Sequence, residues 1–328
     1  EMLIEYYIVN GRVKVFTLAE ETVRLVNDIT TVEMVSPLLR QLRFCFDKFT
    51  LSETYVQAHQ NTIQAFTDWC LKQLYAELIA PVVPLLEGKK ILFVPHGLLH
   101  YVPFHALHDG GQYLIEQHEI SYCPSASVFK LCAEKARSQP ATGPMLIVGA
   151  PDEATPFISD EVEAVRALWP DAQVRLGEEA TLERLKRDAP QARRLHLASH
   201  AVFRRDNPLF SALKLADAWL SFYDIFNLDL RAELVTLSGC ETGLNGLYPG
   251  DELFGLMRGF LYAGAPSLIV SSWIVKDRST AEFMRQLYEG LSQGLSKRAA
   301  LRQAQLGMKR AYEHPYYWAA FRLMGDPS

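Results

Sequence analysis

Short apolar runs recur along the second half of the chain, and each one ends in a polar or glycine-containing turn. Two of them, 194–200 and 233–240, close on His200 and Cys240. Uninterrupted apolar runs of this length are typical of strands buried on both faces of a parallel sheet. Further strands are predicted at 145–148, 174–176, 267–273 and 320–323, and helices at 160–169, 182–188, 251–262, 280–291 and 297–312. This alternation predicts an α/β fold with one mostly parallel sheet flanked by helices.

The first half opens with a different pattern, that of a β-hairpin. Strand-like segments at 4–9 and 13–18 flank Asn10-Gly11, a dipeptide that favours the two-residue hairpin turn. Apolar periodicity then predicts helices at 35–49 and 62–86 and strands at 89–94 and 119–123. The stretch 134–144, which carries Pro, Gly, Ser and several charges, is the best boundary. We therefore expect two subdomains, at 1–138 and 139–328.

The two halves share one local arrangement. Lys89-Lys90 precedes a strand that His96 follows, just as Arg193-Arg194 precedes the strand that His200 follows. A duplication explains this likeness, but a basic pair before a buried strand is also common, and the sequence leaves both readings open. Only the second half supplies a cysteine at the matching strand end.

Composition places the chain among ordinary globular proteins. Of its 328 residues, 49% are hydrophobic and 22% charged, and the net charge of -5 gives no reason to expect a nucleic-acid partner. No apolar run approaches the roughly 18 residues that span a bilayer, and the first residues lack the features of a signal peptide. We expect a cytoplasmic protein without membrane contacts. The five scattered cysteines show no CxxC spacing, which favours reduced thiols over disulfides or a zinc ribbon.

His200 and Cys240 together suggest nucleophilic catalysis. The carboxyl ends of parallel strands meet at one edge of a sheet, so a thiol and an imidazole placed there would face one crevice. A thiol with a pKa near its usual value of about 8.5 needs a base to become a nucleophile, and an imidazole can take the proton and later return it. Backbone N–H groups of Gly239 and Ala201 are candidate donors to the oxyanion. A buried structural thiol is the alternative interpretation of Cys240.

Ordered motifs run through nearly the whole chain. They are LHLASH at 195–200, LSGCET at 237–242, GDE at 250–252, RGF at 258–260, AGA at 263–265, VSSW at 270–273, WAAF at 318–321 and GDP at 325–327, with echoes at 94–104 and 122–127. This set resembles the CHAT family of caspase-like peptidases, relatives of caspases, separase, legumain and gingipains. The resemblance implies a caspase-like fold with an N-terminal pseudo-caspase-like α/β half. It also implies a His200/Cys240 dyad, an extended polypeptide substrate, and no metal or organic cofactor.

The sequence departs from that family at two positions. The family usually has Gly directly after the histidine, where this chain has Ala201, so a methyl group would border the oxyanion site. Ile274 stands where separase-like relatives carry an acid that helps to select a basic substrate residue, so arginine specificity is not expected. The remaining candidates for a substrate pocket are Asp224, Asp251, Trp273 and Asp277. For the three aspartates, capping a helix or a turn is the favoured alternative.

The remaining histidines and cysteines are expected to have structural roles. His196 is expected to be a packed, hydrogen-bonded imidazole, because it lies on the opposite strand face from its neighbours. The histidines at 96, 100, 105 and 108 do not predict a metal site, because Pro95, Gly97 and Pro103 prevent the continuous helix that would align them. Cys45, Cys70 and Cys132 fall on helical apolar patterns, and Cys123 ends a strand. Glu241 could orient His200 or cap the next segment.

A cysteine esterase of the α/β-hydrolase type is a weaker alternative. The segment 238–243 superficially resembles a nucleophile elbow, but Ser238 stands where that turn needs Gly. The base also precedes the nucleophile in the chain, which reverses the α/β-hydrolase order.

The sequence therefore predicts a cysteine endopeptidase, a thiol protease that hydrolyses a polypeptide. The family resemblance suggests control by an attached sensor module or partner, such as TPR repeats upstream, in prokaryotic signalling, defence or cell death. No such repeat is visible in these residues, and a first residue other than Met is consistent with a fragment. The alternative is a catalytically inactive caspase-like module that binds a peptide or a partner protein in the same crevice.

Overall fold

The structure is a computed structural model of residues 1–328. It describes residues 1–86, 90–138, 142–153, 155–202, 211–239, 252–273, 275 and 277–328, without the side chains of 252–255 and Asp277. Cys240, Glu241, Asp251 and Ile274 lie outside the described residues.

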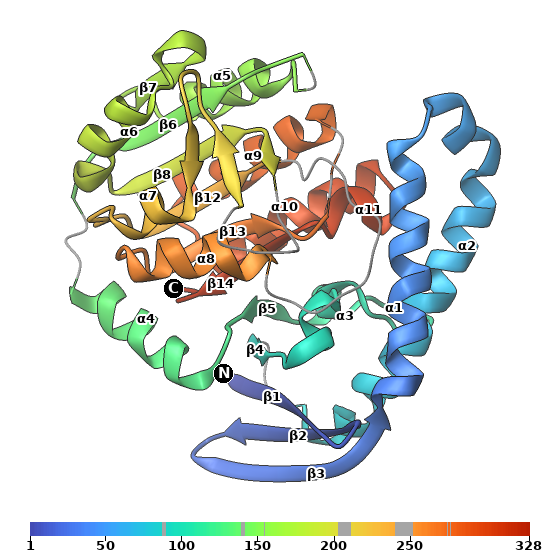
Figure 1. Ribbon diagram of the computed structural model, residues 1–328. Coiled ribbons are helices and arrows are strands. Elements are labelled where there is room, and N and C mark those ends of the chain that lie inside the picture. Colours follow the sequence, from blue (N-terminus) through green and yellow to red (C-terminus); the bar gives the residue numbers. More distant parts are fainter. Residues whose placement is uncertain are drawn as a thin grey trace.

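One eleven-stranded sheet runs through both halves of the described chain (Figure 1). Its strands are β1 (Met2–Val9), β2 (Arg12–Ala19), β3 (Thr22–Thr31), β4 (Lys90–Val94), β5 (Glu119–Tyr122), β6 (Met145–Ala150), β7 (Gln173–Leu176), β8 (Arg194–Ser199), β12 (Leu234–Ser238), β13 (Ser267–Ser271) and β14 (Phe321–Gly325). Their order is β3-β2-β1-β4-β5-β14-β13-β12-β8-β6-β7. Neighbouring strands are parallel except at β1–β2, β2–β3 and β13–β14. The expected mostly parallel α/β sheet is confirmed.

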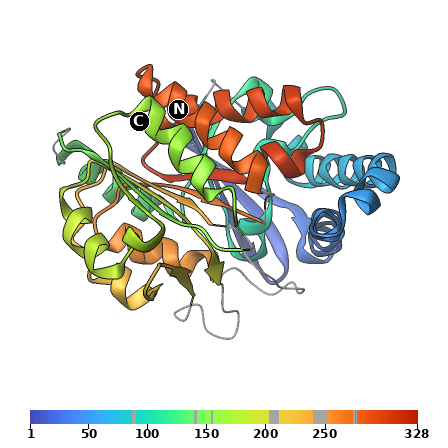
Figure 2. The ribbon, with the colours of Figure 1, turned by 90° about the horizontal axis from the view of Figure 1, so that it is seen from above.

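Helices cover both faces of the sheet. They are α1 (Val32–Asp47), α2 (Glu53–Leu78), α3 (Leu114–Gln117), α4 (Ala126–Ser138), α5 (Ile158–Leu168), α6 (Leu182–Asp188), α7 (Phe222–Phe226), α8 (Glu252–Tyr262), α9 (Asp277–Ser292), α10 (Lys297–Ala311) and α11 (Pro315–Trp318). Figure 2 shows α5, α9 and α10 on one face and α6, α7 and α8 on the other. The hydrophobic core lies between these layers, and central strands such as β6 and β12 are buried along their whole length. No helix in the described ranges is both long and apolar enough to cross a membrane.

The first half differs from the expected elements at two places. A third strand, β3, follows the hairpin, and its residues are mostly exposed because it forms the edge of the sheet. The alternation of apolar and polar residues is confined to its first residues, where Val23 and Leu25 are exposed, so the pattern did not indicate a strand with a buried face. The second helix runs over Glu53–Leu78 instead of 62–86. The helix starts earlier because Ser52 caps it: the Ser52 Oγ accepts the Tyr55 N–H at 3.3 Å. It ends at Leu78 because Pro81 follows, in the 3₁₀ turn Ala80–Leu85.

Polar side chains tie the two halves together where β5 and β14 meet. Arg322 on β14 donates to the carbonyl of His100 at 2.6 Å and lies over the ring of Tyr122 at 5.1 Å. His105 bridges the Tyr122 hydroxyl at 2.7 Å and the Ala319 carbonyl at 2.8 Å. The sheet is continuous across this junction, and the division into subdomains at 138/139 stays a prediction.

Three histidines that are shielded from solvent should make the fold sensitive to acid. Burial lowers the pKa of His100, His105 and His314 from 6.5 to about 3. Below pH 6.5 the unfolded chain therefore binds protons that the folded chain does not, and the free energy of unfolding decreases as the pH falls from 6.5 towards 3. Denaturant unfolding of wild type and His314→Asn at several pH values measures this effect. Asn keeps a capping oxygen without the titration, so its pH dependence should be shallower, and identical slopes would contradict the prediction.

Candidate active site

The structure brings His200 next to the residue that precedes Cys240. β8 and β12 are neighbouring parallel strands with Ala198 paired to Ser238, so both end at the same edge of the sheet. His200 follows β8, and Gly239 follows β12. Cys240 is the next residue along the chain and lies outside the described residues, so the dyad itself stays a prediction.

Gly239 and Ala201 fit closely against each other. A Cβ on Gly239 would lie 3.0 Å from the carbonyl oxygen of Ser199 and 3.2 Å from the Ala201 methyl group. Ala201 is fully buried, so its methyl group fills the space that a side chain at Gly239 would need. Ser271 on β13 donates to the Gly239 carbonyl at 3.0 Å and holds the peptide that leads into Cys240. The departure from the family at Ala201 is therefore accommodated by the packing.

Sequence reasoning missed Asp152, a carboxylate beside His200. It follows β6, the other neighbour of β8, and its Oδ2 lies 3.9 Å from His200 Nδ1 and 2.9 Å from Lys214 Nζ. The Thr155 N–H and hydroxyl donate to its other oxygen at 3.0 and 2.9 Å. The side chains of His200 and Asp152 are only 15% and 19% exposed. Because little water surrounds them, their electrostatic interaction is stronger than it would be at the open surface. The sequence showed only that Asp152 comes just after a buried apolar run, and its place beside His200 depends on the order of the strands.

A small sheet continues from His200 and was also missed. β9 (Ala201–Val202), β10 (Ala212–Lys214) and β11 (Trp219–Ser221) form a three-stranded antiparallel sheet. The Lys214 N–H donates to the carbonyl of His200 at 2.8 Å, which fixes the backbone at the candidate base. The ring of Trp219 meets the His200 ring edge to face, with centroids 6.4 Å apart. Strands of two or three residues are too short to produce a periodic signal.

Two of the four candidate pocket residues can be placed, and both have structural partners. Asp224 forms a capping box with Ser221 at the start of α7 and pairs with Lys186 at 2.7 Å. Burial raises the pKa of Asp224, but the hydrogen bonds from Lys186 and Ser221 together lower it below its ordinary value. Trp273 donates to the Tyr316 carbonyl at 3.0 Å and packs on Phe46 of α1, with ring centroids 4.4 Å apart. The cap interpretation of Asp224 is thus borne out by the geometry.

The side chains of the other two pocket candidates lie outside the described part of the chain. Asp277 is the first residue of α9, but its side chain is not described, and Asp251 lies outside the described residues. Both stay predictions.

The matching strand ends of the first half do not carry a reactive thiol. Cys123 follows β5, but its side chain is fully buried and burial raises its pKa to about 12. His96 follows β4, accepts the Ile8 N–H at 3.1 Å and stacks on Tyr7. A thiol with that pKa is almost entirely protonated near neutral pH, so it is a poor nucleophile. Cys123 is therefore a suitable control for labelling at Cys240.

Neither the other thiols nor the histidine cluster adds a reactive centre. Cys45, Cys70 and Cys132 are buried and unbridged, as their apolar patterns predicted. In the described part of the chain, no three His, Cys, Asp or Glu side chains converge on a common point. His105 and His108 instead contact the backbone carbonyls of Ala319 and Asp68.

His196 is confirmed as a packed, hydrogen-bonded imidazole. It is fully buried; its Nε2 lies 2.9 Å from Glu161 of α5, and its Nδ1 lies 3.1 Å from the Tyr288 hydroxyl. Tyr288 also donates to Thr236 on β12 at 3.0 Å. Because Thr236 and His196 are paired across β12 and β8, this network joins the two strands that lead to Cys240 and His200.

Removing one hydroxyl from this network should destabilise the protein. In Tyr288→Phe the buried polar atoms of His196 and Thr236 lose a shared partner, so we expect the free energy of unfolding to fall by about 1–3 kcal/mol. Chemical denaturation measures the change. Tyr223→Phe is the matched control. Tyr223 is 75% exposed, so removing its hydroxyl group should leave the free energy of unfolding unchanged. Equal stabilities of the two variants would contradict the structural role.

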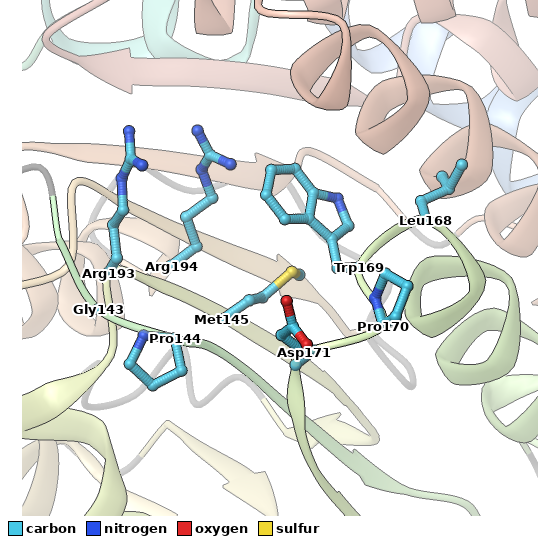
Figure 3. A pocket seen from close by; sticks show the side chains of 10 residues that line it. Gly143, Pro144, Met145, Leu168, Trp169, Pro170, Asp171, Arg193 and Arg194 are labelled. Atoms are coloured by element: carbon cyan, nitrogen blue, oxygen red, sulfur yellow. The ribbon is translucent and has the colours of Figure 1, made fainter.

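A hollow at the other end of the strands, opposite their carboxyl ends, is separate from this site. It is lined near the amino ends of β6 and β8 by residues that include Met145, Trp169, Arg193 and Arg194 (Figure 3). The Arg194 guanidinium lies over the Trp169 ring at 4.6 Å, and Glu233 pairs with both arginines. His200 lies at the carboxyl end of β8, so this hollow does not contribute to the candidate active site.

Fold and strand-end geometry define the chain as a protein of caspase-like fold. The chain belongs to the CHAT domain family, whose pattern matches residues 68–326. The solved structures it resembles include Saccharomyces cerevisiae separase in its complex with securin, with a TM-score of 0.72 and 10% identity over 99% of this chain and 30% of that one. Gingipain R, an Arg-specific cysteine proteinase, gives a TM-score of 0.55 and 12% identity over 80% of this chain and 67% of that one. At these identities the likeness shows the fold alone.

Curated relatives are longer proteins. Tetratricopeptide repeat protein 28 from Homo sapiens is 25% identical in an alignment that covers 78% of this chain and 13% of the relative. Its Mus musculus counterpart is 26% identical with the same coverage. The chain therefore spans about 13% of the length of the curated relatives it matches.

Proposed function

We propose that this protein is a cysteine endopeptidase in which Cys240 is the nucleophile and His200 the general base and acid. The observation that carries the proposal is the pairing of β8 with β12, which sets Ser199 and Ala201, the residues on either side of His200, against Gly239, the residue before Cys240. Separase and gingipain R share the fold, and the second is described as a cysteine proteinase. Together these support hydrolysis of a peptide bond.

The proposed reaction divides amide hydrolysis into two steps. His200 takes the thiol proton, the sulfur attacks the carbonyl carbon, and the resulting oxyanion accepts hydrogen bonds from the proposed N–H donors of Gly239 and Ala201. The tetrahedral intermediate collapses to a thioester as His200 protonates the leaving amine. Water, deprotonated by His200, then attacks the thioester and releases the acid and the free thiol. Asp152 would stabilise the imidazolium that exists between these transfers.

Regulation by another protein segment is part of the proposal. The curated relatives are named for tetratricopeptide repeats, and the separase structure is a complex with securin. Both support a module or partner that controls access to the site. A role in prokaryotic signalling, defence or cell death rests on the family resemblance, whereas the curated relatives are mammalian.

Labelling with a thiol-directed peptide electrophile tests the proposed nucleophile. Wild type should be modified at one cysteine, Cys240→Ala should lose the modification, and Cys123→Ala should keep it because that thiol is buried. Intact-mass spectrometry reads the result. A folded wild type that binds peptides but remains unlabelled would favour the alternative, a catalytically inactive interaction module.

A further inference from the structure

Trp219 is a partly exposed aromatic side chain that lies beside the candidate base on an anchored hairpin. It is 46% exposed, although its ring contacts His200. The hairpin that carries it closes with a hydrogen bond from the Leu215 N–H to the Ala218 carbonyl at 2.8 Å. Its tip is anchored to α6, because Asp217 accepts the Leu182 N–H at 3.0 Å. An indole fixed in this way presents an apolar face without having to be ordered by a ligand.

The alternation of side chains along the hairpin places Trp219 on a definite side of His200. Leu213 and Leu220 are paired and buried, and Leu213 lies 3.6 Å from the position of a Cβ on Gly239. Lys214 and Trp219 are paired on the other face, where Lys214 reaches Asp152 beyond β6. Trp219 therefore flanks His200 on the side of β6, away from Gly239.

We infer that Trp219 forms the wall of a subsite for the substrate residues on the leaving-group side of the scissile bond, and that it selects large apolar or aromatic side chains there. The inference rests on the proposed function. His200 must reach the leaving nitrogen to protonate it, so the peptide that departs with this nitrogen extends past His200, away from the nucleophile. The residues it meets on that side include Trp219, whose ring favours apolar and aromatic contacts.

A cleavage profile that records both sides of each cut tests the subsite. Wild type, Trp219→Ala, Trp219→Phe and Trp69→Ala would be incubated with a mixture of denatured peptides, and mass spectrometry would identify the cuts. Wild type should favour large apolar residues in the first two positions after the cut by about tenfold. Trp219→Ala should lose this preference while the residues before the cut stay the same, and Trp219→Phe should keep it. Trp69 is also 46% exposed but lies on α2, so Trp69→Ala should match wild type.

The outcomes separate the subsite from the proposed function. A Trp219→Ala profile identical to that of wild type would overturn the subsite and leave the peptidase standing. Cys240 labelling by an electrophile that lacks leaving-side residues should proceed at the wild-type rate in Trp219→Ala. If labelling slows as much as cleavage, Trp219 supports His200 and does not select substrate. A wild type that neither cleaves nor is labelled at Cys240 overturns the proposed function, and the subsite with it.

Discussion

His200→Ala should lower kcat/KM for peptide cleavage by about 10⁴-fold, near the upper end of what general acid–base catalysis contributes. The variant keeps the thiol but loses the group that removes its proton and later protonates the leaving nitrogen. The measurement uses the peptide sequence that wild type cleaves fastest. Because alanine leaves a space where the ring was, added imidazole should restore part of the rate in His200→Ala only.

The matched control for this prediction is His96→Ala. His96 also follows a strand end, but it is exposed, stacks on Tyr7 and accepts the Ile8 N–H. We expect His96→Ala to keep wild-type activity. If His200→Ala kept activity within about tenfold of wild type, another group would be the base.

Much of the candidate site follows from one property of parallel sheets. The apolar runs before His200 and Cys240 indicated buried strands, and neighbouring parallel strands end at a common edge. The pattern predicted that both strands end at this edge, and the structure adds that β8 and β12 are direct neighbours. The edge strand β3 was missed because its residues are mostly exposed and form no continuous apolar run.

Asp152 and Trp219 could not be assigned to the site because their positions depend on strand order. β7 follows β6 in the chain, yet β6 lies between β7 and β8 in the sheet, and only this order places Asp152 beside His200. Trp219 approaches His200 through a hairpin of very short strands. Sequence patterns reveal which segments are buried, but contacts between distant segments require the arrangement of the whole sheet.

Asp152 lies where its carboxylate can assist His200 in catalysis. Its carboxylate faces the ring nitrogen of His200 that would point away from the thiol, and Thr155 fixes its orientation. The separation of 3.9 Å is longer than a hydrogen bond, and catalytic contacts often shorten when substrate binds. A carboxylate at this place orients the imidazole and stabilises its protonated form, as the aspartate of a Ser-His-Asp triad does. We therefore treat Asp152 as a positioning residue.

Asp152→Asn should lower kcat by about 10²-fold or more, with little change in KM. Asn keeps the shape of the side chain but removes the charge, so a loss confined to kcat would identify an electrostatic effect on His200. Labelling of Cys240 by the peptide electrophile should slow as well. Asp152→Glu, which keeps the charge, should retain part of the rate. Lys214→Met, which removes the cation that shares this carboxylate at 2.9 Å, should leave most activity intact. Wild-type kcat in Asp152→Asn, or equal losses in Lys214→Met, would assign Asp152 to holding the β10–β11 hairpin and not to catalysis.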